Sequence, residues 1–134
     1  MTITQMDISF PGGQKVDAQY CGFTIHTDQP VEDGGEDSAP TPFSLFLASL
    51  GTCTGYYVLT FCQKRKIPTK DIKVTARIDR NPTTHMVEKY AMEIHVPKDF
   101  PEQYKNAMVK VAESCVVKKH LMKPPEITLT VVQS

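Results

Sequence analysis

The sequence predicts an α+β domain in which largely antiparallel strands surround one long, buried, cysteine-bearing helix. Three observations support this prediction. Segments in which apolar and polar residues alternate lie on both sides of a long apolar run, and an amphipathic helical pattern follows near the carboxyl end. The chain has 134 residues, which suits a single domain spanning residues 1–134.

The first part of the chain has the pattern of three strands. Apolar residues alternate with polar ones over residues 5–10 and again over residues 16–20, and Gly12-Gly13 between them is typical of a tight turn. Gly22 ends the second strand, and residues 23–27 form the third. We therefore expect a hairpin followed by one further strand.

An acidic segment, residues 28–42, follows these strands. It contains five carboxylates, three prolines and a Gly34-Gly35 pair, but no lysine or arginine. Loops of this length within a compact domain are usually functional or mobile. Two interpretations stay open: a mobile lid over a site, or a solvated surface loop.

The apolar run, residues 43–66, predicts a long helix. Its apolar side chains cover nearly the whole circumference, which is typical of a helix that is buried on most sides. The cationic residues 64–66 suit the negative end of the helix dipole, and Pro68 ends the helix. Because a chain this short can hardly surround such a helix alone, we expect a partner subunit to cover it, as in a homodimer.

The remaining predicted elements follow in order along the chain. Alternating patterns predict two strands, over residues 72–78 and 90–96. A capping-box spacing then begins an amphipathic helix over residues 99–116, which carries Cys115 near its end. A last alternating segment, residues 127–131, predicts a final strand.

The composition excludes several classes of protein. Basic and acidic residues number 15 each, so the chain lacks the basic excess of a nucleic-acid-binding protein. We expect no segment to be long and apolar enough to span a membrane, and residues 1–10 lack the charged-then-apolar pattern of a signal peptide. A cytoplasmic protein with reduced thiols is expected.

Four scattered cysteines, Cys21, Cys53, Cys62 and Cys115, are too few for a disulfide framework. On one helix, the Cα atoms of Cys53 and Cys62 would lie roughly 13 Å apart, beyond the limit of about 7 Å for a disulfide. Any redox partner of Cys53 must therefore come from elsewhere. Cys115 is the best candidate, because both predicted helices present apolar faces that must pack on something.

Other interpretations of these residues stay open. A free cysteine such as Cys53 often behaves as a small buried hydrophobe without reactivity. Cys115, His120 and Cys53 together offer three potential zinc ligands, but they lack the close paired spacing of a structural zinc site. We therefore predict no metal site, and the residues alone leave Cys53 either structural or reactive.

Two segments of the chain carry a family resemblance. Residues 38–53, SAPTPFSLFLASLGTC, resemble the first-cysteine helix of the OsmC/organic hydroperoxide resistance family, and residues 112–121, AESCVVKKHL, resemble its second-cysteine segment. The order of strands and helices also matches, so the resemblance extends over almost the whole chain. It implies an OsmC-like fold and an intertwined homodimer, with two active sites at the subunit interface.

The resemblance also implies thiol peroxidase chemistry without a metal or organic cofactor. In this interpretation an organic hydroperoxide oxidises Cys53 to a sulfenic acid, Cys115 resolves it as a disulfide, and an external dithiol restores both thiols. Apolar neighbours would favour organic hydroperoxides over hydrogen peroxide, namely Phe43, Phe46, Leu50 and Tyr57.

One departure from the family bears on this chemistry. Peroxidases of the family activate their thiolate with an arginine from an N-terminal loop, whereas no arginine precedes Arg65 here. Lys118, Lys119 and His120 are candidate substitutes. Two further hypotheses stay open: an OsmC-fold protein that binds an apolar or electrophilic small molecule without efficient peroxidase activity, and a purely structural dimer with inert cysteines.

Overall fold

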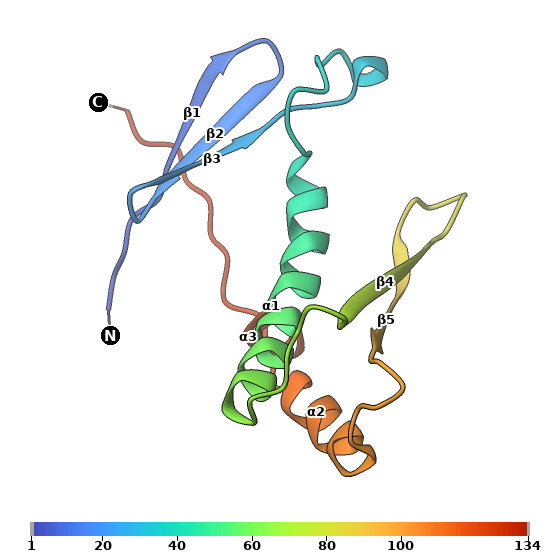
Figure 1. Ribbon diagram of the computed structural model, residues 1–134. Coiled ribbons are helices and arrows are strands. Elements are labelled where there is room, and N and C mark those ends of the chain that lie inside the picture. Colours follow the sequence, from blue (N-terminus) through green and yellow to red (C-terminus); the bar gives the residue numbers. More distant parts are fainter. Residues whose placement is uncertain (1, 134) are drawn as a thin grey trace. The chain divides into compact units, whose positions relative to one another are not determined.

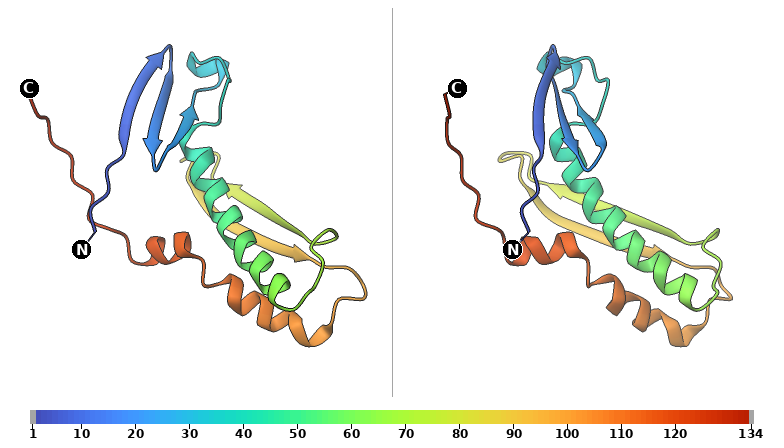
Figure 2. Two further views of the ribbon diagram at one scale, coloured as in Figure 1. Left: turned by 60° about the vertical axis from the view of Figure 1, so that its left-hand side comes forward. Right: turned by 90° about the vertical axis from the view of Figure 1, so that its left-hand side faces the viewer.

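The computed structural model describes residues 2–133, which divide into two compact units (Figure 1, Figure 2). The first unit extends to Ala48 and the second begins at Ser49. Helix α1, Pro42–Lys64, begins in the first unit and continues in the second. The single domain over residues 1–134 stays a prediction.

The first unit contains a three-stranded antiparallel sheet in the order β1-β2-β3, as the sequence predicts. Its strands are β1 (Asp7–Gly12), β2 (Lys15–Tyr20) and β3 (Phe23–Thr27). A bulge between Ser9 and Gly12 interrupts the pairing of β1 with β2. The apolar side chains of Ile8 and Phe10 are exposed, so one set of β1 side chains has no cover within this chain.

A buried carboxylate organises the acidic loop of the first unit. Asp28 is only 1% exposed and accepts hydrogen bonds from the backbone N–H groups of Gln29 (2.7 Å), Ser38 (3.1 Å) and Glu36 (3.3 Å), and from the Ser38 hydroxyl (2.6 Å). The loop also contains a short 3-10 helix, η1 (Val31–Asp33). A carboxylate held by four donors favours a fixed loop over a mobile lid.

Both ends of α1 have local hydrogen bonds that define them. Thr41 caps the start, where its Oγ1 accepts a hydrogen bond from the Ser44 N–H at 3.2 Å, and Pro42 suits the first helical position. At the other end Lys66 adopts a left-handed conformation (φ 56°), and the Ile67 N–H donates to the Cys62 carbonyl at 2.9 Å. The predicted long helix is therefore confirmed.

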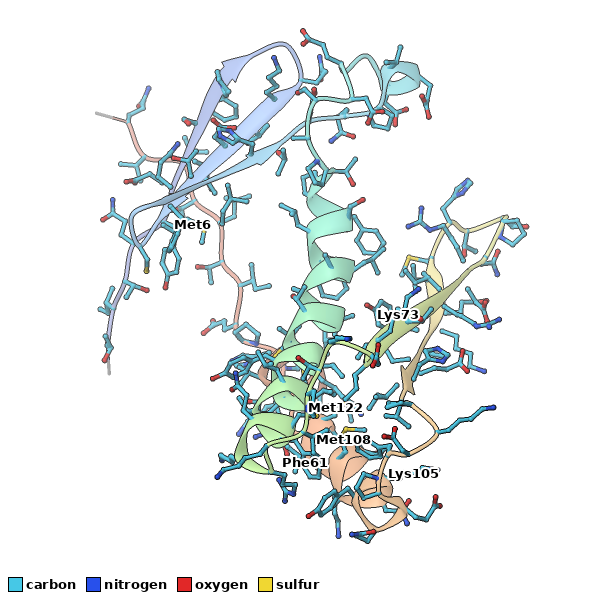
Figure 3. The ribbon with its side chains drawn as sticks, viewed as in Figure 1. Met6, Phe61, Lys73, Lys105, Met108 and Met122 are labelled. Atoms are coloured by element: carbon cyan, nitrogen blue, oxygen red, sulfur yellow. The ribbon has the colours of Figure 1, made fainter. Side chains whose placement is uncertain are left out.

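In the second unit, one face of α1 builds the core. Its buried residues recur at helical spacing: Leu50, Thr54, Val58, Phe61 and Cys62. Val58, Phe61 and Cys62 pack with residues of the following segments, namely Phe100, Met108 and Ala112, and Figure 3 shows Met108 beside Phe61. Other parts of the helix stay uncovered, since Tyr56 is 60% exposed. Burial on most sides is thus not achieved by the single chain.

The β-hairpin of the second unit confirms the next two predicted strands. β4 (Lys73–Arg80) pairs with β5 (Val87–His95) in antiparallel register, with Ala76 opposite Met92. The Asn81 side chain accepts hydrogen bonds from two backbone N–H groups, those of Thr83 (2.8 Å) and Thr84 (3.0 Å), and so fixes the connecting turn.

The predicted helix over residues 99–116 is wrong as one element. The structure has a 3-10 turn, η2 (Glu102–Tyr104), followed by two helices, α2 (Lys105–Ala112) and α3 (Val116–Met122). The 3-10 turn η2 begins directly after Pro101, and no side chain, including that of Asp99, caps it. Extended backbone at Cys115 (φ −50°, ψ 124°) separates the two helices, although the apolar spacing continues across the break.

The predicted strand over residues 127–131 is also wrong for the single chain. This segment has no strand pairing, and Ile127, Leu129 and Val131 are 86%, 96% and 94% exposed. The alternating pattern marks a segment that suits a sheet, but a strand forms only where a neighbouring strand supplies hydrogen bonds. Within the described residues no such neighbour pairs with it.

The prediction that no segment is long and apolar enough to span a membrane is wrong by length and composition. Among the described residues, α1 meets this criterion. The core helix of a soluble protein meets it equally, because both kinds of helix must remove apolar side chains from water. In α1, the buried face described above packs against protein.

Asp28 yields a prediction about stability and pH. The hydrogen bond from the Ser38 hydroxyl, aided by the backbone N–H of Gln29, holds the pKa of Asp28 at about 2, below its ordinary 3.8. Its contribution to stability is therefore complete above about pH 4 and is lost as the pH falls toward 2. We expect Asp28→Asn to lower the urea midpoint at pH 7, with a smaller difference from the wild type at pH 3.

Limited proteolysis provides the second measurement for this variant. Asp28→Asn should be cut faster within residues 28–38 than the wild type. Asp37→Asn is the matched control, because Asp37 lies in the same loop but its side chain is exposed. Equal cutting of the two variants would contradict an anchoring role for Asp28.

Candidate functional site: two cysteines on α1 and α3

Helix α1 carries Cys53 at a turn made of small residues. Gly51, Thr52, Thr54 and Gly55 surround it in sequence, and its side chain is half-buried. Small neighbours allow other elements to approach the helix closely at this turn. The thiol is therefore shielded from bulk solvent without being sealed inside the core.

Cys115 lies at the break between α2 and α3. After α2 ends at Ala112, the Glu113 and Ser114 N–H groups close the last turn onto the carbonyls of Val109 and Val111 (both 3.0 Å). The extended backbone at Cys115 then turns its side chain into the protein, where it is 1% exposed. Cys115 is thus the N-cap residue of α3 rather than a residue within a helix.

The structure brings Cys53 and Cys115 together, although 61 residues separate them in sequence. The Cys115 side chain is hydrogen-bonded to the Cys53 sulfur. Backbone N–H groups of Val117 and Val116, in the first turn of α3, donate to the same sulfur. These N–H groups are available because the first turn of a helix has no intrahelical carbonyl partners for them.

This arrangement lowers the pKa of Cys53. Burial acts to raise the pKa, but hydrogen bonds from the Val117 N–H, the Cys115 side chain and the Val116 N–H together outweigh it. Each of these donors stabilises the thiolate more than the thiol. Neutral backbone donors therefore favour the thiolate here, without a cationic side chain beside the sulfur.

The other two cysteines lie in different surroundings. Cys62 is fully buried in the core of the second unit, and burial raises the pKa of its thiol despite the attraction of Arg65. Cys21 is exposed in the turn between β2 and β3, with a left-handed backbone (φ 52°). The pKa values of two thiols on the same helix, Cys53 and Cys62, are thus shifted in opposite directions.

The residues predicted to bind substrate lie along α1. Phe43 and Phe46, in the first unit, stack on each other with ring centroids 5.6 Å apart. In the second unit Leu50 is buried, while Tyr57 packs edge-on against Tyr56 with centroids 5.9 Å apart. Their contact with a substrate stays a prediction.

Tyr90 of β5 supports the cysteine turn of α1 and was missed from the sequence. Its hydroxyl is hydrogen-bonded to the Gly51 backbone, although burial raises the pKa of Tyr90 overall. A Cβ atom placed at Gly51 would lie 3.1 Å from this hydroxyl, so the glycine allows the close approach. No sequence pattern links these two residues, because their contact depends on how the hairpin packs on α1.

The candidate cations do not act on the Cys53 sulfur. Lys118, Lys119 and His120 are all exposed, and the His120 Nδ1 is hydrogen-bonded to the Val116 carbonyl at 2.8 Å. None of the three contributes to the lowered pKa of Cys53. Among residues 2–133, no group of three or more His, Cys, Asp or Glu side chains is placed to hold a metal ion.

The backbone donors Val116 and Val117 were also missed from the sequence. Their valine side chains suggested only the continuation of an apolar helix face. A helix-breaking residue near Cys115 would have indicated that a new helix begins there, but Glu113 and Ser114 do not force a break in a helix.

The family comparison covers the part of the chain that contains both cysteines. The model of the OsmC-like protein family matches residues 35–130, which include both Cys53 and Cys115. The chain belongs to the OsmC-like family. Membership suggests an association with peroxide-related stress defence. No curated protein matches the chain.

Solved structures share the fold of this OsmC-like protein at low sequence identity. A candidate osmotic-stress-induced and detoxification response protein from Psychrobacter arcticus has a TM-score of 0.72 and 18% identity, with 89% of this chain and 88% of that chain covered. A hypothetical protein from Aquifex aeolicus has a TM-score of 0.67 and 19% identity, covering 92% and 90%. The OsmC organic hydroperoxide resistance protein of Legionella pneumophila has a TM-score of 0.57 and 21% identity, covering 90% and 91%.

The backbone donors predict the effect of one substitution on the pKa of Cys53. Val116→Pro removes one N–H donor, the ψ of 124° at Cys115 lies in the range preferred before proline, and residue 116 is the first helical position of α3, which accepts proline. We expect the pKa of Cys53 to rise, so that less thiolate is present at neutral pH. The pH dependence of alkylation by iodoacetamide, followed at Cys53 by mass spectrometry, measures this change.

Val116→Ala is the matched control for this measurement. It removes most of the side chain and keeps the N–H group, so the pKa of Cys53 should stay at the wild-type value. A rise of similar size in both variants would show that the valine side chain, rather than the N–H group, controls the thiol.

Proposed function

We propose that this OsmC-like protein is a thiol peroxidase that reduces organic hydroperoxides through Cys53 and Cys115. The observation that carries the proposal is the hydrogen bond between these two thiols, which come from separate helices. The backbone donors on the Cys53 sulfur support the same proposal, since the thiolate is the nucleophile in reactions with peroxides.

The reaction has three steps. The Cys53 thiolate attacks the outer oxygen of the hydroperoxide, and the S–O bond forms as the O–O bond breaks. The outer oxygen keeps its hydrogen, so Cys53 becomes a sulfenic acid, and the alkoxide leaves and takes up a proton from solvent to give the alcohol. The Cys115 thiol then attacks the sulfur of the sulfenic acid, which forms the disulfide and releases water. An external dithiol finally reduces the disulfide by thiol exchange and is itself oxidised to a disulfide.

The same proposal assigns substrate contact to apolar residues of α1. Phe43, Phe46, Leu50 and Tyr57 follow one another at spacings of three or four residues along the helix, and Cys53 falls into the same series. Apolar surface near the thiolate favours a hydroperoxide with an organic substituent. Neither a metal nor an organic cofactor takes part in the proposed steps.

A second candidate function is the binding of an apolar or electrophilic small molecule without efficient peroxidase activity. The observation that favours it is the group of donors on Cys53, which consists of backbone N–H groups and a thiol but no cationic side chain. Such donors stabilise a thiolate less than an adjacent guanidinium does. The rate of peroxide reduction distinguishes the two candidates.

Peroxide treatment tests the redox pair directly. One equivalent of cumene hydroperoxide added to the reduced protein should produce a Cys53–Cys115 disulfide, mapped by non-reducing mass spectrometry. Cys53→Ser should lower the rate of peroxide consumption by roughly 10³-fold or more, because it removes the nucleophile. Cys115→Ser should stop at the sulfenic acid, which dimedone traps.

Cys62→Ser is the control for this experiment, because the Cys62 thiol is buried and its pKa is raised. This variant should form the disulfide at the wild-type rate if it folds. Thiols that stay unchanged in the wild type under these conditions would refute the peroxidase proposal and leave the binding function.

We further propose that the protein is an intertwined homodimer. The single chain leaves large apolar side chains exposed on α1 (Tyr56, 60%) and over residues 127–131 (Leu129, 96%). A second copy is the simplest cover for a helix and an unpaired strand segment that both lack neighbours in their own chain.

The dimer predicts a mass and a disruptive substitution. Light scattering with size exclusion should give about twice the chain mass of 15.0 kDa. Tyr56→Glu places a charge on the exposed apolar part of α1 and should weaken the dimer by at least tenfold in dissociation constant. Gln63→Glu, also on α1 and exposed, should have no effect. A wild-type monomer at micromolar concentration would contradict the proposal.

We propose a cytoplasmic location. Members of the OsmC-like family are typically soluble, and α1 lies within the residues that match the family. The apolar character of α1 then serves the protein core and the dimer interface. The proposed dithiol reductant and reduced thiols suit the same compartment.

A further inference from the structure

The second unit contains a cavity of about 470 Å³, a size typical of small-molecule sites. Six apolar side chains from β5, α2 and the residue after β5 form most of its lining: Met92, Ile94, Val96, Met108, Val109 and Ala112. Met92 and Ile94 are two residues apart, so they share one face of the hairpin, while Met108 and Ala112 share one face of α2. Thr54, next to Cys53, adds a hydroxyl to the lining.

Charged side chains contribute to the lining of this apolar cavity. Lys105 of α2 (Figure 3) is ion-paired with Glu102 at 2.8 Å, so its charge is largely matched. Lys118 of α3 makes no ion pair among the residues that the structure describes. Glu113, on the other side of Cys115 in sequence, is the single acidic residue of the lining.

We propose that this cavity binds an amphipathic monoanion, an aliphatic chain with one carboxylate, with the carboxylate on Lys118. The apolar walls take the chain, because burying methylene groups is the main source of affinity that they offer. An unpaired ammonium group at the edge of an apolar site selects a negative head group. Glu113 opposes a second negative charge, which disfavours a phosphate dianion.

This proposal goes beyond the peroxidase function, because it involves no sulfur chemistry and no peroxide. Binding is therefore measured on reduced protein without oxidant, so its failure is distinct from a failure of the redox proposal. Isothermal titration calorimetry with octanoate, decanoate and dodecanoate, below their micelle concentrations, is the experiment. We expect the dissociation constant to fall by up to about fourfold per added methylene until the chain fills the cavity.

Neutral and dianionic probes test the head group. Decanol and decyl phosphate have the same number of carbon atoms as decanoate, and both should bind at least several-fold more weakly than decanoate. Lys118→Gln should raise the dissociation constant of decanoate by about tenfold and leave that of decanol unchanged. Lys119→Gln is the matched control, since Lys119 is the next residue on α3, is exposed and does not line the cavity.

A further variant tests the location of the chain. Val109→Trp narrows the cavity, and this variant is expected to fold because Val109 is 47% exposed. It should weaken the binding of octanoate, decanoate and dodecanoate. Equal binding of decanol and decanoate, or equal effects of Lys118→Gln and Lys119→Gln, would overturn the proposal. Absence of binding would also overturn it.

Discussion

The structure depends on one constraint, the apolar surface of α1. The chain buries only the face that contains Val58 and Phe61, against the β4–β5 hairpin and α2. Burying side chains of this size stabilises a fold by about 1.5–3 kcal/mol each. The exposed remainder, such as Tyr56, is the strongest physical argument that the helix is completed by another molecule.

The contrast between Cys53 and Cys62 shows how local donors decide thiol chemistry. Both thiols lie on α1 and burial shields both from solvent, which by itself disfavours the charged thiolate. Only Cys53 faces a helix start, where N–H groups lack carbonyl partners. Composition and helix position are therefore poor guides to reactivity, whereas the nearest unsatisfied donors are decisive.

Much of the fold could be predicted from the sequence because short-range patterns determine it. The three N-terminal strands, α1 and the β4–β5 hairpin have clear periodicity and distinct ends, and the structure confirms them. The break at Cys115 could not be predicted, since the residues around it continue an apolar helical pattern. The strand over residues 127–131 was wrong because its formation requires a partner strand, which a pattern within one segment cannot reveal.

The same distinction applies to the site. The two cysteines were identified from sequence, and their approach was inferred from apolar helix faces and the family resemblance. The groups that act on Cys53 could not be identified, because backbone N–H groups at Val116 and Val117 have no side-chain signature. The first turn of α3 supplies these donors and also carries Lys118 of the cavity. Since α3 has no fully buried residue of its own, its position depends on these neighbouring contacts, and any displacement of α3 alters the thiol site and the cavity together.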